Sequence, residues 1–274
     1  MITIAIPLGT GTQWEDNFEL KYFLRSLDAF LKVDFEVKLY TRRLPSWLKR
    51  DAAKYEIVDK YYPDKALRVW DGTPHFESYF DTLHKLELMA GDSDVTENFL
   101  YCYDDMALLR PVYSFADIKL WYAQVRYLDK KKKYDRRGSK WTQTTMTVKD
   151  LIGERFVYDY ETHLPRYYNR ERLLRMFSDY PVEDQITPYA PATMYGNLFC
   201  EPDGIIDEGN PVKAGFYGDA RPKVGGSYPS FSTREVEEAC RSKLWMNYNN
   251  KGFRQGFIQP WLEQQFPNKS IFEK

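Results

Sequence analysis

Two adjacent aspartates, Asp104 and Asp105, directly follow an apolar, aromatic-rich run that begins at Phe99. Neighbouring carboxylates repel each other and lose hydration near a core, and a divalent cation or a bound cationic group would offset this cost. Their hard oxygen atoms suit Mg²⁺ or Mn²⁺, which bridge carboxylates to the phosphates of a nucleotide. The alternative is a turn whose aspartates cap the next element or face water. Because α/β folds bind ligands at strand ends, we predict a metal and diphosphate site here.

A second group of side chains capable of chemistry surrounds His163, one of three histidines in the chain. The pKa of an imidazole lies near neutrality, which suits His163 to act as a general base for an acceptor hydroxyl. Glu161 could orient its ring, and Pro165 stiffens the turn that follows. The alternative is a structural histidine that serves only the turn.

Basic side chains that could bind phosphate lie in two places. Lys85 falls in a helix that the apolar pattern predicts over residues 80–90. The long charge run of residues 130–140 lies between two aromatic segments. Within it, the candidates for holding an anionic acceptor are Lys131, Lys132, Arg136 and Arg137. The alternatives are a solvated helix lysine and a solvated loop.

The elements that would position these side chains begin with an apolar strand over residues 1–8, which ends in a glycine-rich turn. The spacing of apolar residues predicts a helix over 17–31, a strand over 35–40 and another short strand at 57–58. This order predicts a parallel sheet with right-handed crossovers. The candidates for shaping a nucleotide pocket and pairing with its phosphates are Pro7, Gly9, Gly11, Thr12, Arg25 and Arg42. A plain tight turn is the alternative for the glycines.

The second half of the chain carries fewer signals. Asn169 is expected to cap the helix that follows it. Residues 181–232 are rich in proline and glycine, which predicts a loop-rich segment that wraps a site. Helices are predicted over residues 235–248 and 260–266, and the second of these would pack the carboxyl terminus back onto the domain.

The composition limits the class of protein. The formal net charge of −1 gives no general attraction to nucleic acid or to an anionic membrane. The three cysteines are widely spaced, which favours a reducing compartment over a disulfide framework. The opening apolar strand is too short for a signal peptide or a membrane span, and no later segment reaches spanning length. We therefore expect a soluble, cytoplasmic protein without a membrane span.

Four segments of the chain resemble the Stealth family of hexose-1-phosphate transferases. Residues 17–27 together with 44–48 resemble the family's block "N-E-L-R-Y-S-L-R-S … P-x-W-L", and residues 99–112 resemble "F-I-Y-x-N-D-D-x-F-x-x-x-P-V". Residues 161–165 resemble the "H-x-P" block, and residues 266–273 the terminal "F-P-x-x-S-x-F-E". The sequence departs from the family after its first strand, where the motif "Y-T-W-V-D-G-S-D" is absent, and at Tyr103, where the family has Asn.

The resemblance implies a single α/β domain over residues 1–274 with a GT-A-like, Rossmann-related architecture. Its sheet would be mostly parallel and flanked by helices, with a loop-rich final third. Residues 1–112 would form the nucleotide-binding half and residues 113–274 the acceptor-side half. A nucleoside-diphosphate sugar would be the donor and a saccharide the acceptor, with Mn²⁺ or Mg²⁺ held by Asp104 and Asp105 and a role in surface-polysaccharide synthesis. The acidic pair also describes ordinary GT-A glycosyltransferases, so both glycosyl transfer and sugar-phosphate transfer remain open.

Two other classes of protein fit parts of the sequence. A phage-type glycosyltransferase that modifies DNA bases would use residues 130–140 on backbone phosphates, but the near-zero net charge counts against it. A non-catalytic carbohydrate-binding protein on a transferase fold fits the aromatic content of 17%. The presence of Asp104, Asp105 and His163 favours chemistry over binding alone.

Overall fold

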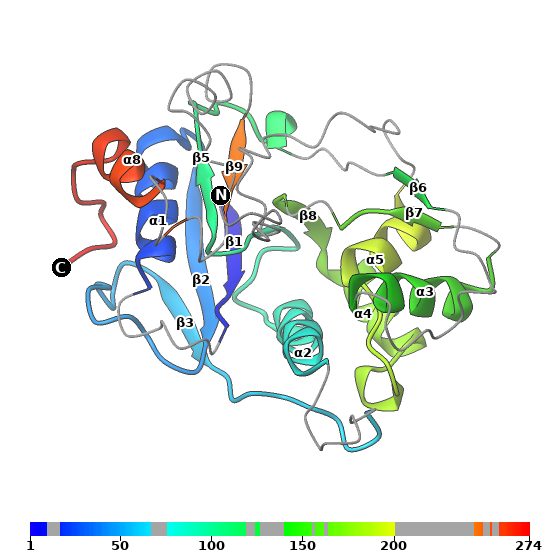
Figure 1. Cartoon of the computed structure of the whole chain (residues 1–274). Coiled ribbons are helices and arrows are strands. Elements are labelled where there is room, and N and C mark those ends of the chain that lie inside the picture. The colour runs from blue at the N-terminus through cyan, green and yellow to red at the C-terminus, as the bar shows by residue number, and fades with distance from the viewer. Residues whose placement is uncertain are drawn as a thin grey trace, which may run out of the picture.

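The centre of the molecule is a five-stranded sheet with the strand order β3-β2-β1-β4-β8 (Figure 1). The computed structural model describes residues 1–9, 17–66, 76–118, 124–126, 140–154, 157–161, 164–200, 244–248, 253 and 258–274. The strands of the sheet are β1 (Ile2–Pro7), β2 (Phe35–Thr41), β3 (Lys54–Ile57), β4 (Asn98–Tyr101) and β8 (Arg166–Asn169). β1 is parallel to β2 and β4, β2 is parallel to β3, and β8 is antiparallel to β4. The predicted α/β fold with a mostly parallel sheet is therefore confirmed.

Helices flank the sheet because its strands are apolar on both faces. Ile4 and Ile6 of β1 belong to the core cluster that includes the apolar side of α1 (Phe18–Phe30). Ala5 points to the opposite face, where it joins the core cluster of α2 (Glu77–Gly91). Figure 1 shows α1 and α8 (Ile258–Gln265) on one side of the sheet and α2 on the other. These two faces hold the main apolar cores of the molecule.

The remaining described elements complete the fold around this sheet. They are β5 (Met106–Leu108), η1 (Phe115–Ile118), β6 (Gln124–Arg126), α3 (Lys140–Ile152), β7 (Val157–Asp159), α4 (Arg170–Asp179), η3 (Val182–Asp184), α5 (Pro191–Phe199) and β9 (Trp245–Asn247). The helices α3, α4 and α5 lie together beside β8 (Figure 1). Asn169 caps α4 as predicted, since its side chain accepts a hydrogen bond from Arg172 N–H. Among the described residues, no helix is both long and apolar enough to cross a membrane.

The strand order creates a switch point beside β1. The chain leaves β1 toward β2 and β3 on one side, and it returns to the other side of β1 to form β4. The connections from the carboxyl ends of β1 and β4 therefore diverge at the same edge of the sheet. Open α/β sheets bind their ligands in the crevice at such a point. Gly9 follows β1 there, and Asp104 and Asp105 follow β4.

The helix predicted over residues 235–248 is wrong in its final part. Trp245–Asn247 form the strand β9, which pairs antiparallel with β5, while residues 235–243 lie outside the described part of the chain. The pairing continues on either side of β9, because Leu109 N–H donates to Leu244 O and Tyr248 N–H donates to Asp105 O. A three-residue strand shows too little alternation to be seen in sequence, and its pairing partner overrides local helix propensity. The helix predicted over 260–266 is confirmed as α8.

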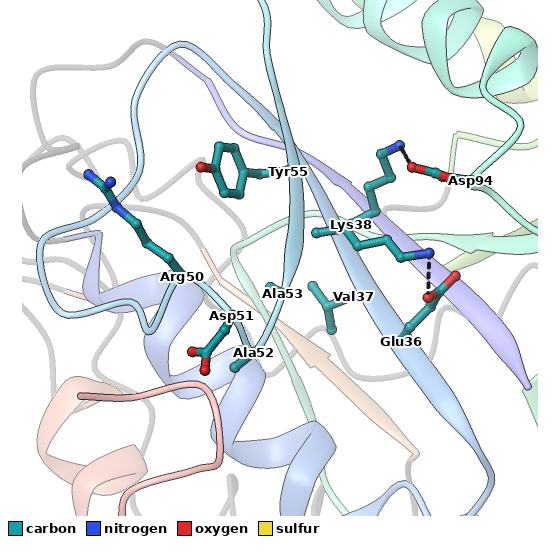
Figure 2. A pocket seen from close by; sticks show the side chains of 10 residues that line it. Glu36, Val37, Lys38, Arg50, Asp51, Ala52, Ala53, Tyr55 and Asp94 are labelled. Atoms are coloured by element: carbon teal, nitrogen blue, oxygen red, sulfur yellow. Dashed lines mark hydrogen bonds and ion pairs between the residues drawn. The ribbon is translucent and has the colours of Figure 1, made fainter.

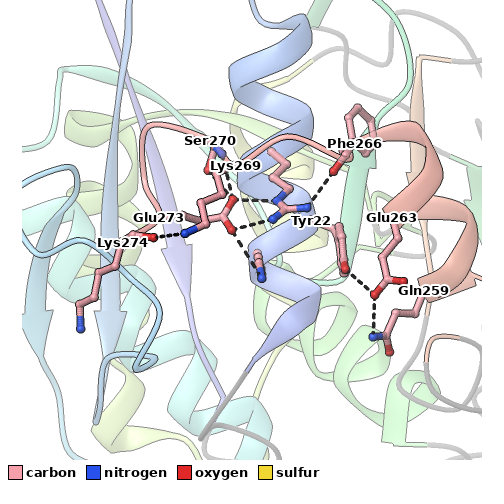
Figure 3. Close-up of polar contacts among 10 residues, drawn as sticks. Tyr22, Gln259, Glu263, Phe266, Lys269, Ser270, Glu273 and Lys274 are labelled. Carbon is pink, nitrogen blue, oxygen red and sulfur yellow. Dashed lines mark hydrogen bonds and ion pairs between the residues drawn. The ribbon is translucent and has the colours of Figure 1, made fainter.

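The carboxyl terminus packs onto α1 through a buried ion pair (Figure 3). Nε of Arg25 lies 2.7 Å from one carboxylate oxygen of Glu273, and a terminal nitrogen lies 2.8 Å from the other. The other terminal nitrogen of Arg25 donates to Phe266 O, and Ser270 N–H donates to Glu273. Burial alone would raise the pKa of Glu273, but the hydrogen bonds from Arg25 and Ser270 and the charges of Arg25 and Lys21 outweigh it and lower this pKa to about 2.

This ion pair predicts a pH-dependent contribution to stability. A carboxyl whose folded pKa of about 2 lies below its ordinary value of 4.5 stabilises the fold above pH 4.5, and it loses that contribution as the pH falls toward 2. We expect Glu273→Gln to lower the free energy of unfolding by about 2 kcal/mol near neutral pH. The difference from wild type should shrink between about pH 4.5 and 2, as measured by urea unfolding at a series of pH values.

The exposed Glu263 of the same segment provides the control for this prediction. Glu263→Gln should change stability by less than about 1 kcal/mol, because exposed carboxylates contribute little. A Glu273→Gln penalty that stays constant across this pH range would show that the ion pair is not the source of the effect.

Candidate active site

Asp104 lies against the amino-terminal end of α1. The side chain of Asn17 makes two contacts there: its oxygen accepts from Leu20 N–H at 3.0 Å and caps the helix, and its Nδ2 donates to Asp104 Oδ2 at 2.9 Å. Asn17 has a φ of 21°, a positive value that Asn tolerates better than most residues. The start of α1 is thereby tied to the turn after β4, and the positive end of the helix dipole favours the negative charge of Asp104.

Asp105 lies in a more negative environment. Burial raises the pKa of Asp105 well above its ordinary value, and the charges of Asp104 and Glu19 raise it further. Glu19 is buried in the first turn of α1. Tyr248 completes this side of the site, because its N–H donates to Asp105 O and its hydroxyl donates to Met106 O at 3.2 Å. Negative charge is thus concentrated at the carboxyl end of β4, where a cation would be stabilised.

The donor atoms at this position fit a magnesium or manganese ion. Two adjacent carboxylates supply hard oxygen ligands, and burial together with the charges of Asp104 and Glu19 makes ionisation of Asp105 costly, a cost that a bound cation would offset. Within the described residues, no group of three or more His, Cys, Asp or Glu side chains is arranged to hold a metal by itself. Asp104 and Asp105 would therefore share the ion with phosphate oxygens, as Mg²⁺ sites for nucleotides commonly do.

Lys85 binds the backbone at the end of β1. Its side chain is 1% exposed, and Nζ lies 2.8 Å from Leu8 O and 2.7 Å from Asp81 Oδ2. Burial raises the pKa of Asp104, while the Asn17 amide and the charge of Lys85 lower it in part. The structure therefore brings Lys85 into the electrostatic field of the carboxylate pair. Its amine already holds the turn that leads to Gly9.

The structure describes the first part of the turn after β1, up to Gly9. Pro7 is the last residue of β1 and lies opposite Tyr40 of β2. Gly9 is exposed, and a Cβ placed on it would meet no atom of the described residues within 4 Å. Contacts with the described residues therefore do not require glycine at position 9.

Glu161 lies in a buried network with Arg166 and Tyr103. One carboxylate oxygen of Glu161 accepts from Arg166 at 2.8 Å, and the other accepts from the backbone N–H of Ala192 at 3.0 Å. The second guanidinium nitrogen of Arg166 donates to the hydroxyl of Tyr103 at 2.8 Å. Both oxygens of Glu161 are therefore engaged by described residues. Since Tyr103 directly precedes Asp104, this network begins at the carboxylate pair.

The two arginines that sequence analysis assigns to phosphate lie in different surroundings. Arg25 is committed to Glu273 and to Phe266 O. The structure does not leave its guanidinium free for a ligand. Arg42 follows β2 at the same sheet edge as Gly9, with Nε 3.6 Å from Asp59 and a side chain that is 65% exposed. Arg42 is thus the more accessible of the two.

Several predicted site residues lie outside the described part of the chain and remain predictions. They are His163, Gly11, Thr12, Lys131, Lys132, Arg136 and Arg137.

The structure adds four residues that sequence analysis did not assign to the site: Asn17, Glu19, Arg166 and Tyr248. Asn17 and Glu19 lie inside the first segment that resembles the Stealth family, and Arg166 directly follows the "H-x-P" segment. Their places in these segments could have identified Asn17, Glu19 and Arg166 as site residues from the sequence. Nothing in the sequence could have identified Tyr248, because its position depends on the pairing of β9 with β5.

A pocket with a volume of about 530 Å³ lies beside β2 and β3 (Figure 2). Its lining includes Lys38, which lies 3.4 Å from Asp94, and Lys54, which lies 2.9 Å from Glu36. Residues 36–38 open β2, whereas the carboxylate pair follows the end of the parallel strand β4. The pocket therefore lies toward the other end of the sheet, and its lysines are already paired.

Comparisons with known proteins do not place the chain in a family. No protein-family model and no curated protein matches the sequence. Among solved structures, the chain is similar to a crystal structure of an active-site mutant of LgtC. This similarity covers 98% of this chain and 98% of that chain, with a TM-score of 0.44 and 11% sequence identity. A likeness of this size does not assign the chain to a family.

Proposed function

We propose that this chain is a metal-dependent transferase that uses a nucleoside-diphosphate sugar and moves a glycosyl or glycosyl-1-phosphate group to an acceptor hydroxyl. One observation carries the proposal: Asp104 and Asp105 lie at the carboxyl end of β4, at the switch point beside β1, in an environment that raises the pKa of Asp105. Two carboxylates at this position suit a divalent cation that binds a diphosphate. Surface-polysaccharide synthesis is the pathway that we propose for it, on a GT-A-like architecture.

Each part of the site has a proposed role. Asp104 and Asp105 would hold Mn²⁺ or Mg²⁺, which would supply positive charge against the leaving phosphate. The turn that begins at Pro7 and Gly9 and continues to Gly11 and Thr12 shapes the nucleotide pocket. Arg42, which is exposed at the same edge, is available to pair with phosphate oxygens.

The acceptor side of the site rests on residues outside the described part. His163 is the proposed general base for the acceptor hydroxyl. The proposed contacts to an anionic acceptor are Lys131, Lys132, Arg136 and Arg137. The position of Glu161, two residues before His163, supports a connection between this segment and the carboxylate pair through Arg166 and Tyr103.

The resemblance to the Stealth family gains support from contacts between its first and last segments. Arg25 pairs with Glu273, and Leu48 forms a β-bridge with Glu273. Lys274 N–H donates to Trp47 O beside this bridge. The motifs of the resemblance therefore meet in space, which favours a shared architecture. We propose membership of this family on that basis.

A panel of nucleotide sugars, each incubated with and without Mn²⁺, tests the proposed function. We expect metal-dependent release of nucleotide from at least one donor. Release of UDP from a UDP-sugar would indicate glycosyl transfer, and release of UMP would indicate sugar-phosphate transfer. No release from any donor, with sugar binding retained, would overturn the enzyme assignment in favour of a carbohydrate-binding protein.

His163→Ala is expected to lower the turnover number by a factor on the order of 10²–10⁴, the usual contribution of a general base, with little change in donor binding. Steady-state kinetics with the best donor of the panel, together with thermal unfolding, measures both quantities. A variant that loses thermal stability but keeps its rate per folded molecule would identify His163 as a structural residue.

A further inference from the structure

Arg166 joins the turn of the candidate active site to a second segment of the chain, which ends at Glu161. Its side chain is 3% exposed. One terminal nitrogen donates to the hydroxyl of Tyr103 at 2.8 Å, and the other donates to Glu161 at 2.8 Å. The guanidinium carbon also lies 5.4 Å from the centre of the Tyr103 ring. A single buried cation thus connects the turn after β4 to the segment after β7.

The backbone fixes Arg166 between these partners. β8 runs antiparallel to β4, and Arg166 lies directly opposite Tyr101, two residues before Tyr103. Glu161 is held at the other end, because its second oxygen accepts from Ala192 N–H in the first turn of α5. Tyr103 is adjacent to Asp104, and Glu161 lies two residues before position 163. The separation between these two parts of the chain is therefore set by the Arg166 guanidinium.

The chemistry of this position requires arginine. The planar guanidinium presents donors in a fixed fork, so that two partners can be held at a defined distance, whereas a lysine amine offers one flexible centre. A buried guanidinium is costly unless it is paired and hydrogen-bonded. Among the described residues, Nε of Arg166 has no hydrogen-bond partner.

We infer that Arg166 is a positioning residue that couples the turn carrying Asp104 and Asp105 to residues 157–161. This inference rests on the proposed function, because the coupled turn is the proposed site of the metal and the diphosphate. When a divalent ion and a nucleotide order that turn, Tyr103 and Arg166 transmit the restraint to Glu161. Residues 157–161 are thereby held at a fixed distance from the turn that carries the carboxylate pair.

Amide hydrogen exchange tests the coupling without an identified substrate. In the wild type, Mn²⁺ with whichever of UDP, GDP and CDP binds should slow exchange of the amides in residues 157–161 by about threefold to tenfold, because ordering the turn lowers the population of locally opened states. Tyr103→Phe keeps the aromatic ring and removes only the hydroxyl. It should still bind Mn²⁺ and the same nucleotide by calorimetry, but the ligands should no longer slow exchange in residues 157–161.

A double-mutant cycle tests the same coupling in turnover. Glu161→Gln retains an oxygen for Ala192 N–H and removes the ion pair with Arg166. Tyr103→Phe and Glu161→Gln should each lower the turnover number of the best donor by about tenfold, and the double variant should be no slower than the slower single variant, because both act through Arg166. Tyr189→Phe is the matched control, since it removes a buried tyrosine hydroxyl that donates to Tyr180 O in the same core. It should leave both the exchange response and turnover unchanged.

The outcomes separate this inference from the proposed function. A wild type that binds Mn²⁺ with none of UDP, GDP and CDP would overturn the proposed function and the inference together. Binding that leaves exchange in residues 157–161 unchanged, or a Tyr103→Phe variant that keeps the full response, would overturn the inference alone. Additive effects of Tyr103→Phe and Glu161→Gln on turnover would also contradict it.

Discussion

Asp105→Asn is expected to lower donor turnover by a factor on the order of 10³ while the protein gains stability in the absence of metal. The loss of turnover follows because one of the two carboxylates that hold the cation is removed. The gain follows because burial, together with the charges of Asp104 and Glu19, raises the pKa of Asp105 in the folded state. An acid whose folded pKa is raised destabilises the fold as the pH rises above its unfolded pKa, so a neutral amide relieves that penalty near neutral pH.

Two measurements check this prediction. Steady-state kinetics gives the loss of turnover, and urea unfolding in the presence of a chelator gives the change in stability. Asp117→Asn is the control, because Asp117 is an exposed carboxylate of η1 and should change neither quantity. An Asp105→Asn variant with nearly wild-type turnover would show that the pair is a solvated turn.

Lys85→Met is expected to lower the free energy of unfolding by about 3–5 kcal/mol, because it leaves the buried carboxylate of Asp81 without its charged partner. A loss of this size is a large fraction of the 5–15 kcal/mol that stabilises a typical domain. Leu8 O also loses its hydrogen bond from Nζ, which loosens the turn before Gly9. Urea unfolding of the metal-free protein measures the effect.

Two further variants identify its cause. The double variant Lys85→Met with Asp81→Leu replaces both partners. It should recover most of the lost free energy of unfolding, since replacing a buried ion pair with apolar side chains often leaves stability unchanged. Lys60→Met is the matched control, because Lys60 pairs with Glu77, which lies in α2 like Asp81 and Lys85, and both of these paired side chains are 36% exposed. Lys60→Met should lower the free energy of unfolding by less than about 1 kcal/mol. Equal losses from Lys85→Met and Lys60→Met would contradict the role of burial.

The sequence predicted the elements whose residues carry strong local patterns. The apolar spacing of residues 17–31 and the alternation from Phe35 correspond to α1 and β2, because burial on one helix face or between layers imposes these periods. The carboxylate pair was likewise visible as charge at the end of an apolar strand. Its position at the switch point followed only from the strand order in the structure.

The parts that could not be predicted depend on contacts between distant residues. Arg25 was expected to bind phosphate, but its carboxylate partner Glu273 lies 248 residues away, and no local pattern specifies that pair. Glu161 was expected to orient His163. The structure adds contacts from Arg166 and from Ala192 N–H of α5 to its two oxygens, while His163 lies outside the described residues and this role stays a prediction. The strand β9 was hidden because its stability comes from pairing with β5 rather than from its own three residues.

Calorimetric titration of Mn²⁺ into the protein with UDP, GDP or CDP present tests the central claim most directly, because Asp104 and Asp105 are proposed to hold the cation against a diphosphate. We expect the wild type to bind Mn²⁺ in the presence of at least one nucleotide, and Asp105→Asn to bind it about a hundredfold more weakly. Asp117→Asn should match the wild type. Wild-type affinity for Mn²⁺ in Asp105→Asn, or nucleotide binding that is the same with and without Mn²⁺, would contradict the account.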